Sequence, residues 1–395
     1  TQALPPVEPA ADLEEEVDRM SERVERLRAL EFEKDVTIDL ARPDEVAERV
    51  QELQLENYGV RQRERDEQTL LALGAIPEGT DVEDLLEDLA TGILGFYVPE
   101  DEELMVGSGA DDLTVNARLT LAHELEHALA DQTFGLPLED NVPGRELDAS
   151  LAARALIEGD ATLLTQHYAM TSVTTEEAND LLDDPALQAA IDAGERLPHA
   201  IRRASEFPYV QGLAFVCDLY GEGGWDAVDA AYEELPTTTA QIMFPERYRS
   251  GEGAIEPEPP GEVREEGWSL GDRSAFGAAD LMLLFEAPGN DTDAALPSAL
   301  TAASGWAGGT LHLWEGAGEV ALGVSLVERE NGDRLCASMQ TWYQRAFPND
   351  DHLAGVGEEK LVSRGTQQDA VLRCSGATVR LGIGPDASIA RDLTR

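Results

Sequence analysis

Residues 119–132 most constrain how this chain can fold, because they read Leu-Thr-Leu-Ala-His-Glu-Leu-Glu-His-Ala-Leu-Ala-Asp-Gln. The segment is rich in helix-forming apolar residues and contains neither Gly nor Pro, so it predicts a helix. Residues four apart lie on one face of a helix, with their Cβ atoms about 5–6 Å apart. His123 and His127 are therefore expected to project side by side, as two imidazoles do when they share one metal ion.

Glu124 follows directly on His123 and completes the pattern His-Glu-x-x-His. A carboxylate in that position can hold an attacking water and accept its proton. The pattern predicts zinc as the metal and metal-assisted hydrolysis, most simply of a peptide bond, as the reaction. Two alternatives are a solvated helix that carries two His by chance and a zinc site that only stabilises the fold. A structural site is normally closed by Cys and His, and no Cys lies nearby.

A catalytic zinc site takes three protein ligands, so a third ligand is needed from elsewhere in the chain. A closely spaced third His is absent, because no His occurs between His127 and His167. Glu158 is the best candidate, since it follows an apolar run in a second helical segment and precedes Gly159. Glycine inside a helix costs about 1 kcal/mol relative to Ala, and we expect it here to let the two helices approach closely. Asp160 and His167 are the other candidates.

These residues resemble the gluzincin branch of the zincin metallopeptidases, the thermolysin-like clan, and within it a group of poorly characterised bacterial and archaeal metallopeptidases. The likeness rests on Gly-Phe-Tyr-Val-Pro at 95–99, His-Glu-Leu-x-His-Ala-Leu-x-Asp-Gln at 123–132 and Ala-Leu-Ile-Glu-Gly-Asp-Ala at 155–161. Pro-Tyr-Val-Gln-Gly-Leu-Ala-Phe at 208–215 and Pro-Glu-Arg-Tyr at 245–248 also fit. Phe244 departs from the pattern, since a His is expected before Pro-Glu-x-Tyr.

The resemblance implies a zinc-dependent peptidase in which Glu124 is the general base. The expected zinc ligands are His123, His127 and Glu158. Gluzincins commonly place a Tyr or His after the third ligand, where it stabilises the oxyanion of the tetrahedral intermediate. Tyr209 is the first candidate for this donor, Tyr248 the second and His199 a weaker third; a buried aromatic with no catalytic part is the alternative. A different function is a zincin scaffold that cleaves nothing and works through its C-terminal domain.

Two short segments ahead of the motif, 92–98 and 103–106, predict a pair of strands joined by Pro-Glu-Asp-Glu. In zincins a sheet edge lies above the metal, so the resemblance makes this hairpin a candidate for binding an extended peptide by strand addition. A purely structural hairpin is the alternative. Asp131, one turn after His127, is either a partner that fixes the imidazole tautomer or an exposed helix residue.

The acidic composition bears on the partners of the chain, which has 79 Asp and Glu against 29 Lys and Arg and a net charge of −50. Phosphate binding needs clustered cations, so nucleic acid is not an expected partner, whereas a protein or peptide substrate is. Acidic residues run through the whole chain, which favours adaptation to high salt over a local patch for basic substrates. No stretch of about twenty apolar residues occurs, so no membrane-spanning segment is predicted.

The cysteines and the first residue predict the compartment. We predict a disulfide between Cys336 and Cys374 in the last third of the chain, as in an exported protein. Cys217 lies in an apolar helix and is predicted to be a buried free thiol. The chain begins with Thr1 rather than Met, which predicts a processed mature form that is extracellular or at the cell surface.

The predicted fold class is α+β, with a mainly helical zincin-like domain, a small N-terminal sheet and a small α+β C-terminal domain. The expected regions are a tail and amphipathic helix at 1–34, a zincin-like metallopeptidase domain at 35–250, a linker at 251–267 and an accessory domain at 268–395. In the last region we expect strands at 309–314, 319–326, 370–374 and 378–382 and a helix at 332–347. His312 is predicted to face solvent or a groove rather than to bind a metal.

Overall fold

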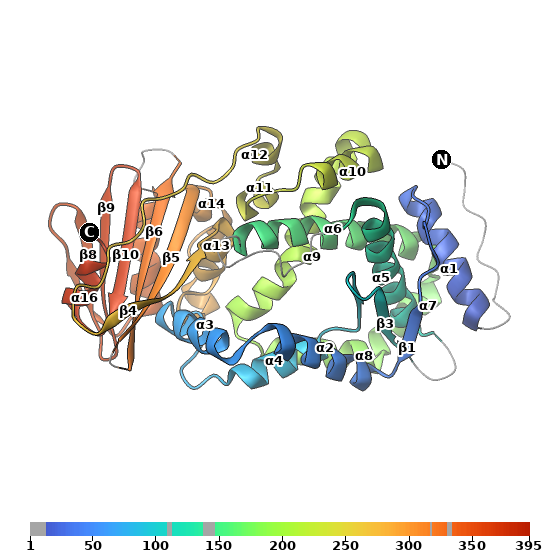
Figure 1. Ribbon diagram of the computed structural model, residues 1–395, viewed down its shortest axis with the longest axis horizontal. Coiled ribbons are helices and arrows are strands. Elements are labelled where there is room, and N and C mark those ends of the chain that lie inside the picture. The colour runs from blue at the N-terminus through green and yellow to red at the C-terminus, as the bar shows by residue number, and fades with distance from the viewer. Residues whose placement is uncertain (1–12, 109–112, 137–146, 317, 330–333) are drawn as a thin grey trace.

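Helices dominate the chain up to the predicted linker, and a seven-stranded sheet follows it, as the two sides of Figure 1 show. The computed structural model describes residues 13–108, 113–136, 147–316, 318–329 and 334–395. The predicted α+β class is confirmed. Among the described helices, none combines the length and the apolar character needed to cross a bilayer.

The elements ahead of the linker form a helical body with one small sheet. They are α1 (Leu13–Arg28), β1 (Ile38–Ala41), α2 (Pro43–Asn57), α3 (Val60–Ala72), α4 (Val82–Thr91), β2 (Gly95–Val98), β3 (Glu103–Gly107), α5 (Val115–Phe134), α6 (Leu147–Ser172), α7 (Thr175–Asp180), η2 (Leu181–Asp183), α8 (Pro185–Arg196), α9 (His199–Gly223), α10 (Trp225–Glu233), α11 (Thr239–Met243) and α12 (Pro245–Arg249).

The elements after the linker surround the larger sheet. They are β4 (Trp268–Ala275), α13 (Ala278–Glu286), η3 (Pro288–Asn290), η4 (Thr292–Ala294), α14 (Ala299–Ala303), β5 (Trp306–Gly316), β6 (Glu319–Glu328), α15 (Arg334–Ala346), β7 (Asp351–Ala354), β8 (Glu359–Arg364), β9 (Asp369–Ser375), β10 (Thr378–Gly384) and α16 (Ala387–Asp392). The four strands predicted here are confirmed as the longer β5, β6, β9 and β10, and the predicted helix as α15.

The small sheet has the order β1-β3-β2, with β3 parallel to β1 and antiparallel to β2. The predicted hairpin is therefore confirmed as β2 and β3. Leu104 and Val106 of β3 pack in one cluster with Leu121 and Leu125 of α5, which fixes the sheet against this helix. Among the described residues, β2 pairs with β3 alone, so its outer edge is available for a further strand.

Helix α5 is buried on almost every side, which explains why its apolar residues follow no single stripe. The Thr114 side chain accepts a hydrogen bond from the backbone N–H of Ala117 and caps the start of the helix. The helix ends at Gly135, whose φ of 70° is readily adopted only by glycine. The helix predicted for the motif residues is thus confirmed.

The backbones of helices α6 and α9 are in direct contact where the helices cross. Two glycines, which have no side chain, allow this close approach. A Cβ atom on Gly159 would lie 2.4 Å from the Gly212 carbonyl, and one on Gly212 would lie 2.0 Å from the Ala155 carbonyl oxygen. The expectation that Gly159 brings α6 close to the motif helix is therefore wrong, because its close neighbour is α9. The crossing places α9, and with it Tyr209 one turn before Gly212, beside the α6 residues near Glu158.

Gly212→Ala is expected to lower the free energy of unfolding by about 1–3 kcal/mol, because the added methyl group meets backbone that cannot move aside. Thermal unfolding measures the change. Gly221→Ala is the matched control, since Gly221 lies on the same helix with open space around its Cα. That control should be neutral or stabilising, because Ala favours helix. Equal melting temperatures for the two variants would contradict the crossing.

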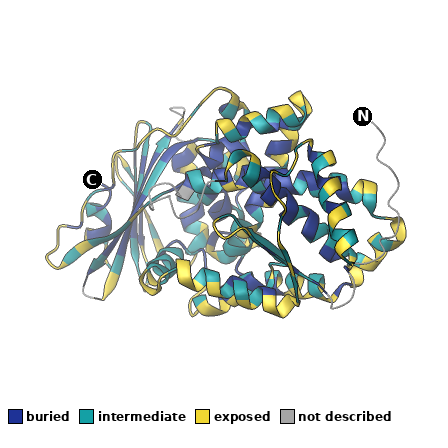
Figure 2. Cartoon of the chain, turned by 45° about the vertical axis from the view of Figure 1, so that its right-hand side comes forward, coloured by how far each residue is buried: buried dark blue, intermediate teal, exposed yellow. Residues whose placement is uncertain are grey.

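The predicted linker lies along the larger sheet instead of hanging free. The backbone N–H of Ile255 donates to the Ala307 carbonyl and that of Gly261 to the Leu393 carbonyl. One core cluster contains Phe215 of α9 and Leu313 of β5, on opposite sides of the linker. Figure 2 shows buried residues both in the helices and in the larger sheet. The division at 251–267 remains a prediction, but the regions on either side of it share one core.

The larger sheet is antiparallel, in the order β4-β5-β6-β10-β9-β8-β7. Cys336 of α15 and Cys374 of β9 are joined, so the predicted disulfide is confirmed. The expectation that His312 faces solvent or a groove is wrong, because its side chain is buried. Leu313 faces the main core, so His312 and Trp314 lie on the opposite face of the strand. That face is covered as well, because Trp314 packs there against the linker and the C-terminal residues.

Cys217 is a free thiol, as predicted, but it is exposed rather than buried. Helix α9 turns Phe215, Val216 and Leu219 into the core. Position 217 falls on the opposite arc of the helix, because each residue advances about 100° around the axis. A residue in an apolar helical segment can therefore still be exposed, depending on the side of the helix on which it lies.

Two buried carboxyl groups lie where α6 and α13 begin. Asp148 accepts hydrogen bonds from the hydroxyl and from the backbone N–H of Thr239, the latter at 3.3 Å. Asp280 accepts one from the backbone N–H of Gly277, at 2.7 Å. Burial, with the charge of Asp280 added, raises the pKa of Asp148 to about 7. Burial alone raises the pKa of Asp280 to about 6. Both groups therefore hold protons more tightly when the chain is folded.

The free energy of unfolding should accordingly fall as the pH rises from about 4, the usual pKa of Asp, to about 7. The Asp148→Asn variant has no ionisable group at this position, so its free energy of unfolding should depend less on pH. We expect it to gain on the order of 1–3 kcal/mol over the parent chain at pH 8 and little at pH 5. Urea unfolding at both pH values measures this, with the exposed Asp351→Asn as control. Parallel pH profiles for Asp148→Asn and the parent chain would count against the argument.

Candidate metal centre

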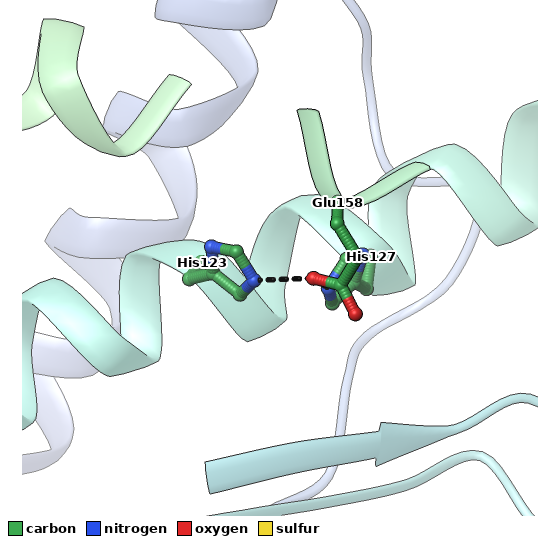
Figure 3. Close-up of side chains that lie close together, drawn as sticks. All are labelled: His123, His127 and Glu158. Carbon is green, nitrogen blue, oxygen red and sulfur yellow. Dashed lines mark hydrogen bonds and ion pairs between the residues drawn. The ribbon is translucent and has the colours of Figure 1, made fainter. Parts of the chain in front are cut away.

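His123, His127 and Glu158 bring their side chains to one point, as Figure 3 shows. The Nε2 atoms of His123 and His127 lie 3.1 Å and 3.4 Å from Oε2 of Glu158. The two ring centroids are 4.7 Å apart with an interplanar angle of 88°, so the rings meet edge to face. The structure thus brings together the three residues that the sequence predicts as metal ligands.

Two helices supply these donors. His123 and His127 lie one turn apart on α5, and Glu158 reaches them from α6. The side chains of His127 and Glu158 are buried, with exposed fractions of 9 % and 8 %, so the surrounding residues restrict their orientation. His123 is partly exposed. One carboxylate oxygen between two imidazole nitrogens is a donor set that suits zinc, and three protein ligands leave one position for water or substrate. The residues present therefore fit a catalytic zinc ion.

The electrostatics of the group also favour a cation. Burial opposes the charge of Glu158, but the two imidazoles outweigh it and hold the pKa of the Glu158 carboxyl well below its usual range. Burial likewise opposes the charge of His127, yet Glu158, with Glu124 and Glu126, raises the pKa of that imidazole to about 9. The carboxylates around His127 thus stabilise positive charge, whether a proton or a metal ion supplies it.

Glu124 lies beside this group and under strand β2. Its side chain is buried, which raises the pKa of its carboxyl, while His123 and His127 partly offset the effect. A Cβ atom on Gly95 would lie 3.3 Å from Cγ of Glu124 and 2.6 Å from the Thr120 methyl carbon. The absence of a side chain at Gly95 therefore lets β2 pack directly on the predicted general base.

Tyr209 joins the site from α9. Its ring stacks on the His123 ring, with centroids 5.9 Å apart and an interplanar angle of 30°. The ring is partly exposed. Burial of the hydroxyl, together with the nearby charge of Glu158, raises the pKa of Tyr209, so the phenol keeps its proton. The first candidate for the oxyanion donor is thus in place.

The other two candidates for that donor are engaged elsewhere. The Tyr248 hydroxyl donates to the Glu234 backbone carbonyl at 2.8 Å. His199 pairs with Glu286, with 3.2 Å between Nε2 and Oε2. Among the described contacts of these two side chains, none is with the predicted metal ligands, so Tyr209 is the one of the three candidates that lies beside them.

The alternatives for the third ligand and for a partner of His127 also lie outside the group. His167 packs edge-on against the rings of Tyr220 and Trp225, at 5.5 and 5.6 Å. Asp131 accepts hydrogen bonds from the Tyr97 hydroxyl at 2.9 Å and from the Leu136 N–H at 3.0 Å, and so closes the end of α5 instead of contacting His127.

Asp160, the remaining alternative, belongs to a buried ionic group that we call the Arg28 cluster. Its members are Arg28, Glu126, Asp160, Asp229 and Tyr232. Arg28 approaches Asp160 with two nitrogens, the closer at 2.9 Å, and reaches Asp229 at 2.6 Å. The Tyr232 hydroxyl donates to Asp160 at 3.0 Å.

Sequence reasoning misses this cluster, although one signal is present. The apolar stripe of the first helix runs through Val24 and Leu27, and Arg28 lies on the same face, four residues after Val24. A charged residue on the buried stripe of a helix indicates a buried partner of opposite charge.

No protein-family model, no curated protein and no solved structure matches this chain. The likeness to gluzincins therefore rests on the residues of the sequence motifs alone.

Proposed function

We propose that this chain is a zinc-dependent hydrolase of peptide bonds. The observation that carries the proposal is the convergence of two imidazole nitrogens and a carboxylate oxygen, all within 4.8 Å of one another, next to Glu124. His123, His127 and Glu158 would hold the ion. When bound, zinc supplies a Lewis acid that polarises the scissile carbonyl and acidifies the attacking water.

Glu124 takes the role of general base. Its carboxylate accepts the proton of the attacking water and later returns it to the leaving amine. Burial raises the pKa of Glu124, which makes its carboxylate a stronger base than an exposed one. The Glu124 side chain is buried close to the Gly95 backbone, and such surroundings favour a general base that is oriented before the substrate binds.

Tyr209 donates a hydrogen bond to the oxyanion that forms as water adds to the carbonyl. The stacking of its ring on His123 supports this role, because it keeps the phenol next to the ligands. The pKa of Tyr209 is raised by burial and by Glu158, so the hydroxyl is a donor throughout the neutral range.

The edge of β2 supports a peptide as the substrate. An extended chain can add to this edge as a fourth strand and pass over Glu124, which packs beneath Gly95. Main-chain hydrogen bonds would then hold the peptide in register with the general base. A substrate without a peptide backbone would gain nothing from the free strand edge.

The location that we propose is an oxidising compartment in a high-salt medium. The disulfide between Cys336 and Cys374 supports the compartment, since such bonds persist outside the cytosol. The net charge of −50 supports the medium, because salt screens repulsion among surface carboxylates.

The zinc content of protein purified in high salt without chelator tests the proposal. We expect about one zinc ion per chain and its loss in His123→Ala. His167→Ala is the matched control, because His167 packs among aromatic rings away from the ligands, and it should keep the metal. A folded parent chain without zinc would refute the proposal, and zinc without cleavage of any peptide would favour the non-catalytic scaffold.

A further inference from the structure

The Arg28 cluster lies on the side of His127 that faces away from Glu158. Nε2 of His127 points to Glu158, at 3.4 Å, whereas its Nδ1 lies 3.8 Å from Oε2 of Glu126. Glu126 is completely buried, although it is the fourth residue of the His-Glu-x-x-His motif and takes no part in the proposed chemistry. A buried carboxylate in this position needs a reason, since burying an unpaired charge is costly.

Three polar atoms are left without a hydrogen bond at this place. They are Nδ1 of His127 and both carboxyl oxygens of Glu126, which make no hydrogen bond of ordinary geometry among the described residues, although burial and the nearby Asp160 raise the pKa of the Glu126 carboxyl. Buried polar groups are nearly always hydrogen-bonded. Nδ1 and Oε2 face each other within about 1 Å of hydrogen-bond distance, so a small rotation of the carboxylate pairs them.

We infer that Glu126 is a positioning residue, which accepts a hydrogen bond from Nδ1–H of His127 and so directs Nε2 of the same ring to the metal position. The inference rests on the proposed function. Its physical basis is general: an imidazole that binds a metal through one nitrogen is oriented by the acceptor of its other N–H. Glu126 is one residue along α5 from His127 and is held by the helix itself.

Arg28 holds Glu126 in turn. The guanidinium of Arg28 lies 3.7 Å from Oε1 of Glu126 and is itself fixed by Asp160. The Trp225 ring covers it, with 4.5 Å between the guanidinium carbon and the ring centroid, and the indole N–H donates to the Leu27 carbonyl at 2.7 Å. The amphipathic helix α1 therefore contributes to the metal centre through the chain of contacts from Arg28 to Glu126 to His127.

The test compares Glu126→Ala and the isosteric Glu126→Gln with a control from the same cluster. Asp229→Asn removes a partner of Arg28 that has no described contact with His127. The first measurement is the zinc Kd by chelator competition. Glu126→Ala is expected to weaken zinc binding about 10–100-fold, since loss of such partners has that effect elsewhere. Glu126→Gln keeps an acceptor oxygen and should weaken it less, while Asp229→Asn should stay within about twofold of the parent chain.

The second measurement needs no metal. Proton NMR of histidine-labelled, metal-free protein should give a downfield, slowly exchanging Nδ1–H signal for His127, assigned by its loss in His127→Gln. We expect that signal to vanish in Glu126→Ala and to persist in Asp229→Asn. If Glu126→Ala does not fold, Glu126→Met takes its place, because it has a similar volume and no acceptor oxygen, and the Nδ1–H signal should vanish there as well.

An unchanged zinc Kd and an unchanged Nδ1–H signal in folded Glu126→Gln and Glu126→Ala would overturn the inference, even if both variants melt at lower temperature. A parent chain that binds no zinc would instead refute the proposed function. The NMR signal then still decides whether Glu126 orients His127, so the two failures are distinguishable.

Discussion

Replacing Glu124 by Gln is expected to lower kcat for peptide hydrolysis roughly 10²–10⁴-fold while zinc stays bound. Gln keeps the volume that packs under Gly95 but can neither accept the proton of the attacking water nor carry it to the leaving amine. The three expected ligands are untouched, so the metal should remain. Cleavage of an unbiased peptide mixture, followed by mass spectrometry, measures the rate, and the zinc content is determined on the same sample.

Glu87→Gln is the control for this experiment, because Glu87 is exposed on α4. It makes the same chemical change away from the site and should retain the activity of the parent chain. Full activity in Glu124→Gln would remove Glu124 from the mechanism. Loss of zinc together with activity would instead assign Glu124 a part in holding the site together.

Arg28→Met should lower the free energy of unfolding by about 3–5 kcal/mol, the usual cost of removing one partner from a buried ionic group. Met has a similar length, so little space is opened. The loss is electrostatic, because the buried Asp160 and Glu126 and the partly exposed Asp229 would remain beside one another without their shared cation. Urea unfolding measures the change at a fixed high salt concentration.

Arg19→Met provides the control on the same helix, where Arg19 pairs with Glu15 at the surface. Surface pairs contribute about 0–1 kcal/mol, so this change should be small. Adding Asp160→Asn to Arg28→Met should recover part of the lost stability, because it removes one of the uncompensated charges. A stability of Arg28→Met equal to that of Arg19→Met would mean that the cluster is already neutralised by protons.

The candidate site is predictable from the sequence because its chemistry is mostly local. Two His four residues apart on a helix must share a face, and an apolar run before Glu158 indicates that this carboxylate is buried. The contact that explains Gly159 is not local, because its neighbour Gly212 comes from another helix. Gly159 indicates that some backbone passes close to α6, and only the tertiary structure identifies α9.

The larger sheet shows the same limit. Strands with an apolar run or an alternating pattern, such as β9 and β10, are predictable, but β7 has four residues and is largely exposed, so it carries little apolar signal. His312 and Cys217 are misjudged because periodicity gives the side of an element on which a residue lies, not whether another element covers that side. Glu126 escapes notice for a related reason, since its partner Arg28 lies in a helix about 100 residues earlier.

The distance along the chain between Arg28 and its carboxylates bears on the order in which the protein forms. Arg28 and Asp160 are 132 residues apart, and Asp229 follows later still. At about 5–20 residues per second, a ribosome needs roughly 7–25 seconds to add the chain between Arg28 and Asp160. During that time no carboxylate from α6 or α10 is present to pair with the guanidinium. Burial of this charge would be costly without them, so the guanidinium stays in water. Helix α1 is thus made before α6 and α10, and Arg28 can pair with Asp160 and Asp229 only after both of those helices have been made.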